Sequence, residues 1–184
     1  MSALYIIRHG MTDWNRIKRI QGGTDIPLND EGRRTASDAA QRYHDVHFDI
    51  CFCSPLIRAR QTAQIFLDGR DVPVEYDDRL KELAFGEYEG LEYPLLPDDH
   101  PVCAAFRDPA GYIPGKGGES IAELIARTRD FLEERAYPLI EQGKDVLIVG
   151  HGAMNSAITV NVRKLPPEKL WEEGIENCVL KRLI

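Results

Sequence analysis

Short apolar runs recur along the chain and alternate with longer stretches in which apolar residues repeat at helical spacing. Four runs predict strands, at Ala3–Ile7, Asp49–Cys53, Val72–Tyr76 and Asp145–Val149, and a weaker fifth strand is expected within Glu176–Ile184. The first, second and fourth runs are almost continuously apolar, which is typical of strands covered on both faces of a parallel sheet.

Helix-start signals fall between these runs. Asn29 precedes two acidic residues and predicts an N-cap. Ser54-Pro55 predicts a cap followed by proline at the first helical position, which would open a helix over Leu56–Leu67. A capping box at Ser120 predicts a long amphipathic helix that continues through Leu139. The alternation of strands and helices predicts an α/β fold, with a mostly parallel central sheet and helices on both faces.

The regular alternation lapses between Gly86 and Glu119. Five of the eleven prolines fall in this stretch, which is too short to form a second domain of its own. We therefore expect residues 1–184 to form a single domain from which 86–119 makes an irregular excursion.

Charge and cysteine content narrow the function classes. The chain has 23 Lys and Arg against 30 Asp and Glu, and its net charge of -7 argues against nucleic acid or a membrane surface as partner. Cys51 and Cys53 lie in an apolar run without a second pair at metal-ligand spacing, so buried thiols are expected rather than zinc. The N-terminal apolar run is too short for a signal peptide, and we expect a cytoplasmic protein.

Chemically active side chains follow each of the four main predicted strands. Arg8 and His9 come after the first strand, Arg58 after the second, Glu82 after the third and His151 after the fourth. Because ligands bind at the carboxyl ends of strands in open α/β sheets, we expect these side chains to share one edge. Arginine matches phosphate oxygens, neutral histidine can be a nucleophile, and a carboxylic acid can protonate a leaving alkoxide. This combination indicates phosphoryl chemistry.

Five sequence blocks in order resemble the histidine phosphatase superfamily, in its phosphoglycerate-mutase-like branch. The blocks are Arg8-His9-Gly10, Ser54 to Ala63, Leu80 to Gly90, Gly117 to Ser120, and Val149-Gly150-His151-Gly152. The resemblance covers nearly the whole chain and implies the fold of that family. It also implies a phosphohistidine mechanism without metal or organic cofactor, in a single catalytic domain whose excursion 86–119 covers the substrate.

The resemblance further implies roles for individual residues. His9 corresponds to the nucleophile that becomes phosphorylated, and Glu82 corresponds to the proton donor. Phosphate and substrate contacts are expected from a larger set, which consists of Arg8, Asn15, Gln21, Gly22, Arg58 and His151. Met11 departs from the family, which usually has a polar residue at this position, and so a supporting hydrogen bond is not expected there.

The reaction could be hydrolysis of a small phosphate monoester or a phosphomutase reaction of the phosphoglycerate type. A mutase must hold a second acidic group, whereas the excursion 86–119 contains seven acidic residues and only two basic ones, Arg107 and Lys116. This balance favours a metal-independent phosphatase. The opposing observation is a basic group after the nucleophile loop that could hold a second anion, formed by Arg16, Lys18 and Arg19.

Two readings from other classes rank lower. Two histidines and a carboxylate could bind zinc, but Arg8 and Arg58 would then stand beside a cation. A phosphate-binding module without turnover would need neither Glu82 nor a second histidine. The expected partner is a small phosphorylated metabolite, whose identity stays open together with the oligomeric state.

Overall fold

A central sheet organises the computed structural model, which describes residues 2–184. Within these residues five strands pair in the order β3-β2-β4-β1-β5. The strands are β1 (Leu4–Arg8), β2 (Ile50–Cys53), β3 (Val74–Tyr76), β4 (Val146–Gly150) and β5 (Leu180–Arg182). Parallel pairs join β1 to β4, β2 to β4 and β2 to β3, and only β5 runs antiparallel, beside β1. The predicted mostly parallel sheet is therefore confirmed.

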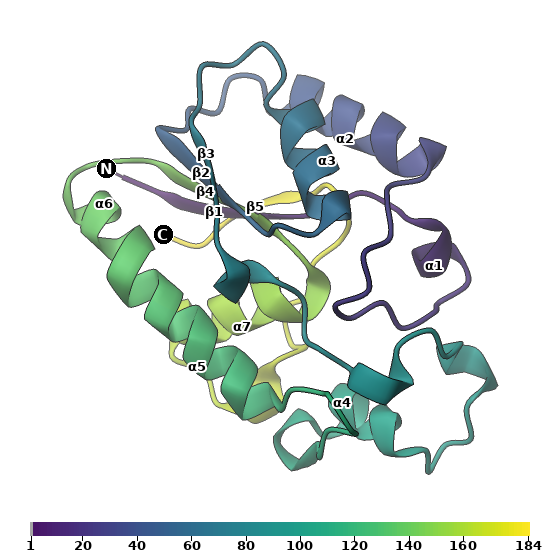
Figure 1. The fold of residues 1–184 in the computed structure, drawn as a ribbon. Coiled ribbons are helices and arrows are strands. Elements are labelled where there is room, and N and C mark those ends of the chain that lie inside the picture. The colour runs from purple at the N-terminus through teal and green to yellow at the C-terminus, as the bar shows by residue number, and fades with distance from the viewer. Residues whose placement is uncertain (1) are drawn as a thin grey trace.

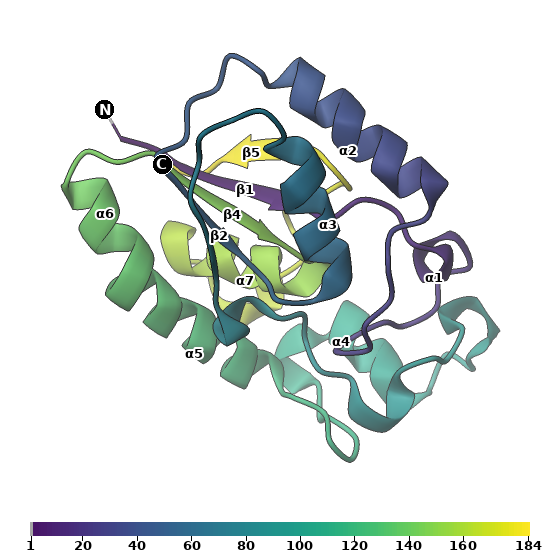
Figure 2. The same ribbon diagram turned by 45° about the horizontal axis from the view of Figure 1, so that its top comes forward.

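Helices cover both faces of this sheet, as Figures 1 and 2 show. On one face lie α2 (Asp30–Arg42) and α3 (Ile57–Phe66), and on the other lie α5 (Ile121–Phe131) and α7 (Gly152–Arg163). Successive side chains of β1 point to opposite faces of the sheet. Ile7 packs with α2 and α3, whereas Ile6 packs with α5 and α7. Three shorter helices complete the set: α1 (Asp13–Arg16), α4 (Ala104–Arg107) and α6 (Tyr137–Glu141).

The predicted N-caps of α2 and α5 are confirmed, and that of α3 is wrong. Asn29 accepts the N–H of Gly32, and Ser120 forms its capping box. At α3 the N-cap is Leu56, which is extended and makes no side-chain cap bond, and the helix begins at Ile57. The Ser54 hydroxyl accepts the N–H of Leu56 at 3.3 Å, but Leu56 is still extended and precedes the helix. The N–H of the first helical residue, Ile57, is instead accepted by Asp25 Oδ1 at 2.6 Å.

The long helix predicted through Leu139 is interrupted. After α5 the backbone widens into a π-helical turn over Leu132–Ala136, and α6 then starts with Pro138 in its first turn. Proline has no N–H to continue the hydrogen-bond ladder, which accounts for the change at this point.

The excursion 86–119 packs against the main core through its own apolar residues. Val102, Ala105 and Tyr112 belong to the same hydrophobic cluster as the inner faces of α5 and α7. Its first part also pairs with the loop after α1, where Gly90 N–H donates to Ile20 O at 2.8 Å. The excursion therefore lies beside the segment that follows His9, next to α1 in Figures 1 and 2.

Two further features are the state of the cysteines and the character of the helices. All four cysteines are buried and free, as predicted for Cys51 and Cys53, and burial raises the pKa of both of these thiols. Within residues 2–184 the structure contains no helix with the length and apolar character needed to cross a membrane.

Candidate active site

His9 directly follows β1 and is almost completely buried, at 2% exposure. Its Nδ1 lies 2.7 Å from the carbonyl oxygen of Gly10. Burial, together with the charges of Arg58 and Arg8, lowers the pKa of His9 well below 6.5. The ring is therefore neutral at pH 7, and Nδ1 must carry its proton in order to donate to Gly10. The lone pair then lies on Nε2, which is the form that a nucleophilic imidazole requires.

The backbone after His9 is held in a single position. Gly10 N–H donates to Thr62 Oγ1 at 3.0 Å, and Thr62 in turn donates to the carbonyl of Arg58 at 2.7 Å. A Cβ on Gly10 would lie only 2.5 Å from the carbonyl oxygen of Gly32, so the loop packs backbone to backbone against α2. These contacts fix the carbonyl that orients the His9 ring.

Arg58 is completely buried in the first turn of α3 and faces the loop after α1. Its Nη1 donates to Thr24 O at 2.8 Å and its Nη2 donates to Gly22 O at 2.7 Å. Its Nε is buried and has no partner within residues 2–184. Burial lowers the pKa of Arg58 from its ordinary value, while Glu82 is the main group that raises it. The guanidinium thus ties the loop to the first turn of α3 through two hydrogen bonds.

Arg8 and Glu82 both lie close to Gly152, the first residue of α7. A Cβ on Gly152 would lie 3.5 Å from Cζ of Arg8 and 3.6 Å from Oε2 of Glu82. Arg8 also donates from Nη1 to Ile175 O at 3.1 Å, and its Nε is buried without a partner within residues 2–184. Both distances are those of ordinary van der Waals contact, so the guanidinium and the carboxylate both pack close to the first residue of the helix.

The Glu82 carboxylate caps the N-terminus of α7. Its Oε1 accepts N–H groups of Met154 at 3.0 Å and Leu83 at 2.9 Å, and its Oε2 accepts the N–H of Ala153 at 3.3 Å. The helix has no cap from its own N-cap residue, His151. Glu82 therefore supplies the hydrogen bonds that a helix N-terminus lacks, and its carboxylate is held next to His151.

His151 follows β4 and is completely buried. Its ring lies 5.2 Å from the His9 ring, between centroids. Burial, then Arg58, His9 and Arg8, lower its pKa well below 6.5. Together these contacts bring Arg8, His9, Arg58, Glu82 and His151 to one edge of the sheet, and we call this group the strand-end pocket. Two cationic arginines beside two neutral histidines suit an anion and would repel a metal cation.

Asn15 lies in α1, and Gln21 and Gly22 lie on the following loop, which Arg58 contacts. The Oδ1 of Asn15 accepts the N–H of Thr12 at 3.1 Å, within the capping box of α1. The Oε1 of Gln21 accepts the Thr12 hydroxyl at 2.9 Å. Gly22 has a φ of +52°, and a Cβ there would lie 2.1 Å from Oε1 of Glu89. The acceptor oxygens of both amides are thus used to build the loop, and phosphate contacts by these residues stay a prediction.

A cavity of about 380 Å³ opens beside Glu82, and we call it the leaving-group cavity. Both cationic side chains that line it are paired. Lys81 lies 3.0 Å from Asp78, and Arg127 binds both oxygens of Glu119. The complete lining is Gly23, Asp78, Lys81, Glu82, Ala84, Gly118, Glu119, Glu123 and Arg127. The space is bounded by carboxylates and by ion pairs that are already formed.

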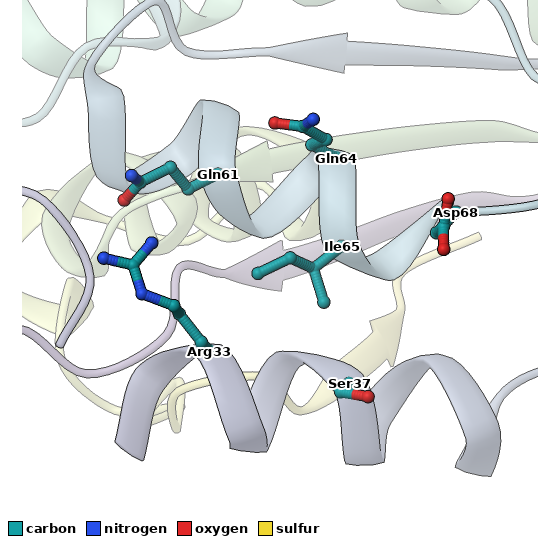
Figure 3. Close-up of a pocket in the computed structure, with 6 residues that line it drawn as sticks. All are labelled: Arg33, Ser37, Gln61, Gln64, Ile65 and Asp68. Carbon is teal, nitrogen blue, oxygen red and sulfur yellow. The ribbon is translucent and has the colours of Figure 1, made fainter. Parts of the chain in front are cut away.

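Figure 3 shows a second hollow, which lies between α2 and α3. Its volume is about 400 Å³. Its lining consists of Arg33, Ser37, Gln61, Gln64, Ile65 and Asp68, so it contains none of the residues predicted to be functional. We assign no chemistry to it.

Four residues that support the pocket were given no role from the sequence. The sequence predicts Ser54 only as a helix cap. The contact between Thr62 and Arg58 could have been predicted, because Thr62 follows Arg58 by four positions on the same helical face. Arg127 donates to the carbonyl of Glu82 at 3.2 Å, and Asn177 donates to the carbonyl of His9 at 2.6 Å. These last two contacts join segments that are distant in the sequence, and no local sequence pattern predicts them.

Comparisons with known proteins agree with this geometry. The profile of the histidine phosphatase superfamily (branch 1) matches residues 4–184. The chain is 35% identical to "2,3-bisphosphoglycerate-dependent phosphoglycerate mutase 2" of Gloeobacter violaceus, over 97% of this chain and 84% of the relative. It is 36% identical to "Uncharacterized phosphatase PhoE" of Bacillus subtilis, over 97% of this chain and 86% of the relative.

A solved structure is similar over almost the full length. A mycobacterial glucosyl-3-phosphoglycerate phosphatase in complex with VO3 superposes with a TM-score of 0.87 at 30% identity, covering 99% of this chain and 92% of that one. The resemblance seen in the sequence blocks is confirmed, and the chain belongs to the histidine phosphatase superfamily, branch 1.

Proposed function

We propose that the protein hydrolyses a small phosphate monoester through a phosphohistidine on His9. The observation that carries this proposal is the state of the His9 ring, which is neutral, buried and hydrogen-bonded through Nδ1 to Gly10. Such a ring presents an Nε2 lone pair beside two arginines that suit a phosphate dianion. Membership of the histidine phosphatase superfamily supports the same chemistry.

In the first half-reaction, Nε2 of His9 attacks phosphorus and the ester P–O bond breaks. The negative charge on the transferring oxygens is stabilised by Arg8 and Arg58, whose buried Nε–H groups have no partner within residues 2–184. The departing alkoxide takes a proton from Glu82, and the alcohol leaves. The products of this step are the alcohol, a phosphohistidine and the Glu82 carboxylate.

The hydrogen bonds of Glu82 indicate which oxygen holds the proton. A carboxylate offers about four lone-pair sites. Two on Oε1 are used by Met154 and Leu83, and one on Oε2 is used by Ala153. The remaining site is on Oε2, so we propose that the acidic proton sits there before it passes to the leaving group.

In the second half-reaction, water attacks phosphorus and the P–N bond to His9 breaks. Glu82 now acts as a base and takes a proton from the water, which restores the acid for the next cycle. Inorganic phosphate leaves and His9 regains its lone pair. No oxidant, metal or further co-reactant enters this scheme.

Hydrolysis is favoured over the mutase reaction by the charges around the pocket. Lys81 and Arg127, which line the leaving-group cavity, are already paired with carboxylates. Arg19, from the basic group after the nucleophile loop, donates to Glu92 at 2.6 Å and lies over the Trp14 ring. A second phosphate near Lys81, Arg127 or Arg19 would compete with the carboxylates that already hold these side chains. A monoester with one phosphate needs only the strand-end pocket.

The excursion 86–119 provides the substrate-side wall in this proposal. Glu89 supports that assignment, because it accepts N–H groups of Gly23 and Thr24 on the loop that Arg58 holds. The partner is a small phosphorylated metabolite. Four free, buried cysteines suit a reducing compartment, and we propose the cytoplasm as the setting.

A two-arm assay tests the proposal. One arm measures phosphate release from a panel of monoesters between pH 5 and pH 8, with EDTA and without it. The other arm measures interconversion of phosphoglycerates in the presence of 2,3-bisphosphoglycerate. We expect phosphate release that EDTA leaves unchanged. Mutase turnover that exceeds hydrolysis of every monoester would assign the mutase reaction instead, and loss in EDTA with rescue by zinc would assign a metallohydrolase.

A further inference from the structure

Ser54 directly follows β2 and stands beside the residue that follows β4. The two strands pair in parallel with Cys53 opposite Val149, and Ser54 N–H donates to Val149 O at 3.0 Å. This register brings the Ser54 hydroxyl to His151, although 97 positions separate the two residues in the chain. Both side chains are completely buried.

The hydrogen-bonding partners determine where the protons lie. Ser54 Oγ accepts the N–H of Leu56 at 3.3 Å and lies 2.7 Å from Nε2 of His151. The single hydroxyl proton of serine has Nε2 as its acceptor. Because His151 is neutral, its ring carries one proton. When Ser54 donates to Nε2, that proton belongs on Nδ1.

The Nδ1 atom of His151 is buried and has no hydrogen-bonding partner within residues 2–184. Leaving a buried donor unsatisfied is costly, so an acceptor from a ligand is expected to meet it. The His151 ring lies 5.2 Å from the ring of His9, between centroids. A phosphoryl group on or near His9 would bring anionic oxygens to this N–H.

We infer that Ser54 is a positioning residue that locks His151 in the Nδ1–H tautomer, so that His151 donates a hydrogen bond to a phosphoryl oxygen. This role rests on the proposed function of the pocket. In the opposite arrangement Nε2–H would donate to Ser54, and an Nδ1 lone pair would face the phosphoryl oxygens and repel them. Ser54 itself needs no contact with the substrate.

The first experiment compares Ser54→Ala with Thr159→Val. Thr159 also carries a buried hydroxyl, but it donates to the carbonyl of Asn155 within α7 at 2.9 Å, and within residues 2–184 it makes no hydrogen bond to His151. We expect Ser54→Ala to lower kcat/KM for p-nitrophenyl phosphate by about 10- to 100-fold, the effect of losing one hydrogen bond to a charged group. The vanadate inhibition constant should rise by a similar factor. Thr159→Val should change neither quantity by more than about twofold.

The second experiment reads the tautomer without turnover, by ¹⁵N NMR of histidine-labelled protein. The wild type should show His151 protonated on Nδ1, and Ser54→Ala should move protonation toward Nε2. A wild-type His151 protonated on Nε2 overturns the inference even if the variant fails to fold, and so does a Ser54→Ala enzyme with unchanged kcat/KM. A wild type that has the Nδ1–H tautomer and binds vanadate but hydrolyses no monoester would overturn the proposed function while supporting the lock.

Discussion

The strand-end pocket and the excursion 86–119 are held together by different kinds of contact. In the pocket His9 and Arg58 are buried and Glu82 is half-buried, and all three are tied to the backbone: His9 to Gly10, Arg58 to Gly22 and Thr24, and Glu82 to the first turn of α7. The excursion consists of short 3-10 turns and the four-residue α4, and two of its apolar side chains, Leu95 and Ile113, are more than 70% exposed.

This difference indicates that the shared chemistry and the choice among substrates depend on different parts of the molecule. Backbone groups that the sheet itself positions can support one chemistry shared by every phosphate monoester. The leaving-group cavity is bounded by side chains in ion pairs, such as Lys81 with Asp78, which can rearrange at little cost. Changes in the pocket should therefore affect all substrates strongly, whereas changes in the cavity should alter the choice among substrates weakly.

The largest effect is expected from the proposed nucleophile. His9→Ala should lower turnover of every monoester by ~10⁴-fold or more, because the covalent route is lost. The wild type should be trapped as an acid-labile phosphoryl adduct, which the variant should lack. His100→Ala removes a histidine from the excursion and should stay within about twofold of wild type. An adduct on His151, or equal losses in the two variants, would break the contrast between the regions.

Glu82→Gln should have the next largest effect, and its size should depend on the leaving group. General-acid help is worth about 10²- to 10⁴-fold, so hydrolysis of an alkyl phosphate should fall by that amount. A nitrophenolate leaves readily without a proton, so p-nitrophenyl phosphate should lose far less. Steady-state kcat/KM on both esters checks this expectation. If both losses are equal, Glu82 acts as the cap of α7 and not as a proton donor.

The buried histidines should also make stability depend on pH. Because burial and the nearby arginines hold the pKa of His9 well below 6.5 in the folded protein, the unfolded chain binds protons first as the pH falls below 6.5. The free energy of unfolding should then decrease, by at most about 1.4 kcal/mol per pH unit for this one group. Above pH 6.5 the stability that depends on a neutral His9 is fully present.

Urea unfolding at pH 7, 6 and 5 measures this slope. His9→Asn should show a shallower loss of stability than the wild type, and His44→Asn provides a control for removing an exposed histidine. The same slope in wild type and His9→Asn would mean that His9 takes up protons equally in the folded and the unfolded chain, which would contradict a lowered pKa in the folded pocket.

The smallest effect should come from the leaving-group cavity. Hydrogen bonds from the Ser120 N–H and hydroxyl lower the pKa of Glu123, so this lining residue stays anionic. Phosphoethanolamine should therefore be preferred over phosphoglycolate, which has the same length and opposite charge, by about three- to tenfold in kcat/KM. Glu123→Gln should narrow that ratio and leave p-nitrophenyl phosphate unaffected. A preference for phosphoglycolate would contradict the charge argument.

The sequence predicted the layers well because their causes are local. Apolar runs located the first four strands to within one or two residues, and the order of strand and helix implied the parallel sheet. Two local predictions were wrong. The cap of α3 was wrong because Leu56 stays extended and the first helical N–H, that of Ile57, is accepted by Asp25 on a distant loop. The long helix was interrupted close to Pro138.

The predicted site residues illustrate the same limit. Topology alone implied that Arg8, His9 and His151 share an edge, and the structure brings them together. Topology could not indicate that Arg58 donates two hydrogen bonds to the 22–24 loop, because that loop has no sequence periodicity from which its position could be predicted. Contacts of this kind depend on how separate segments pack, and they become visible only when the chain is folded.

The contact between Gly10 and Gly32 has a consequence for engineering this protein. A Cβ at Gly10 would meet the carbonyl oxygen of Gly32 at 2.5 Å, and a Cβ at Gly32 would meet the carbonyl oxygen of Met11 at 2.1 Å. Each obstacle is main chain, so no choice of neighbouring side chain could make room. A library that diversifies the walls for a new ester must keep both glycines, because any larger residue would shift His9 away from the phosphate it is proposed to attack.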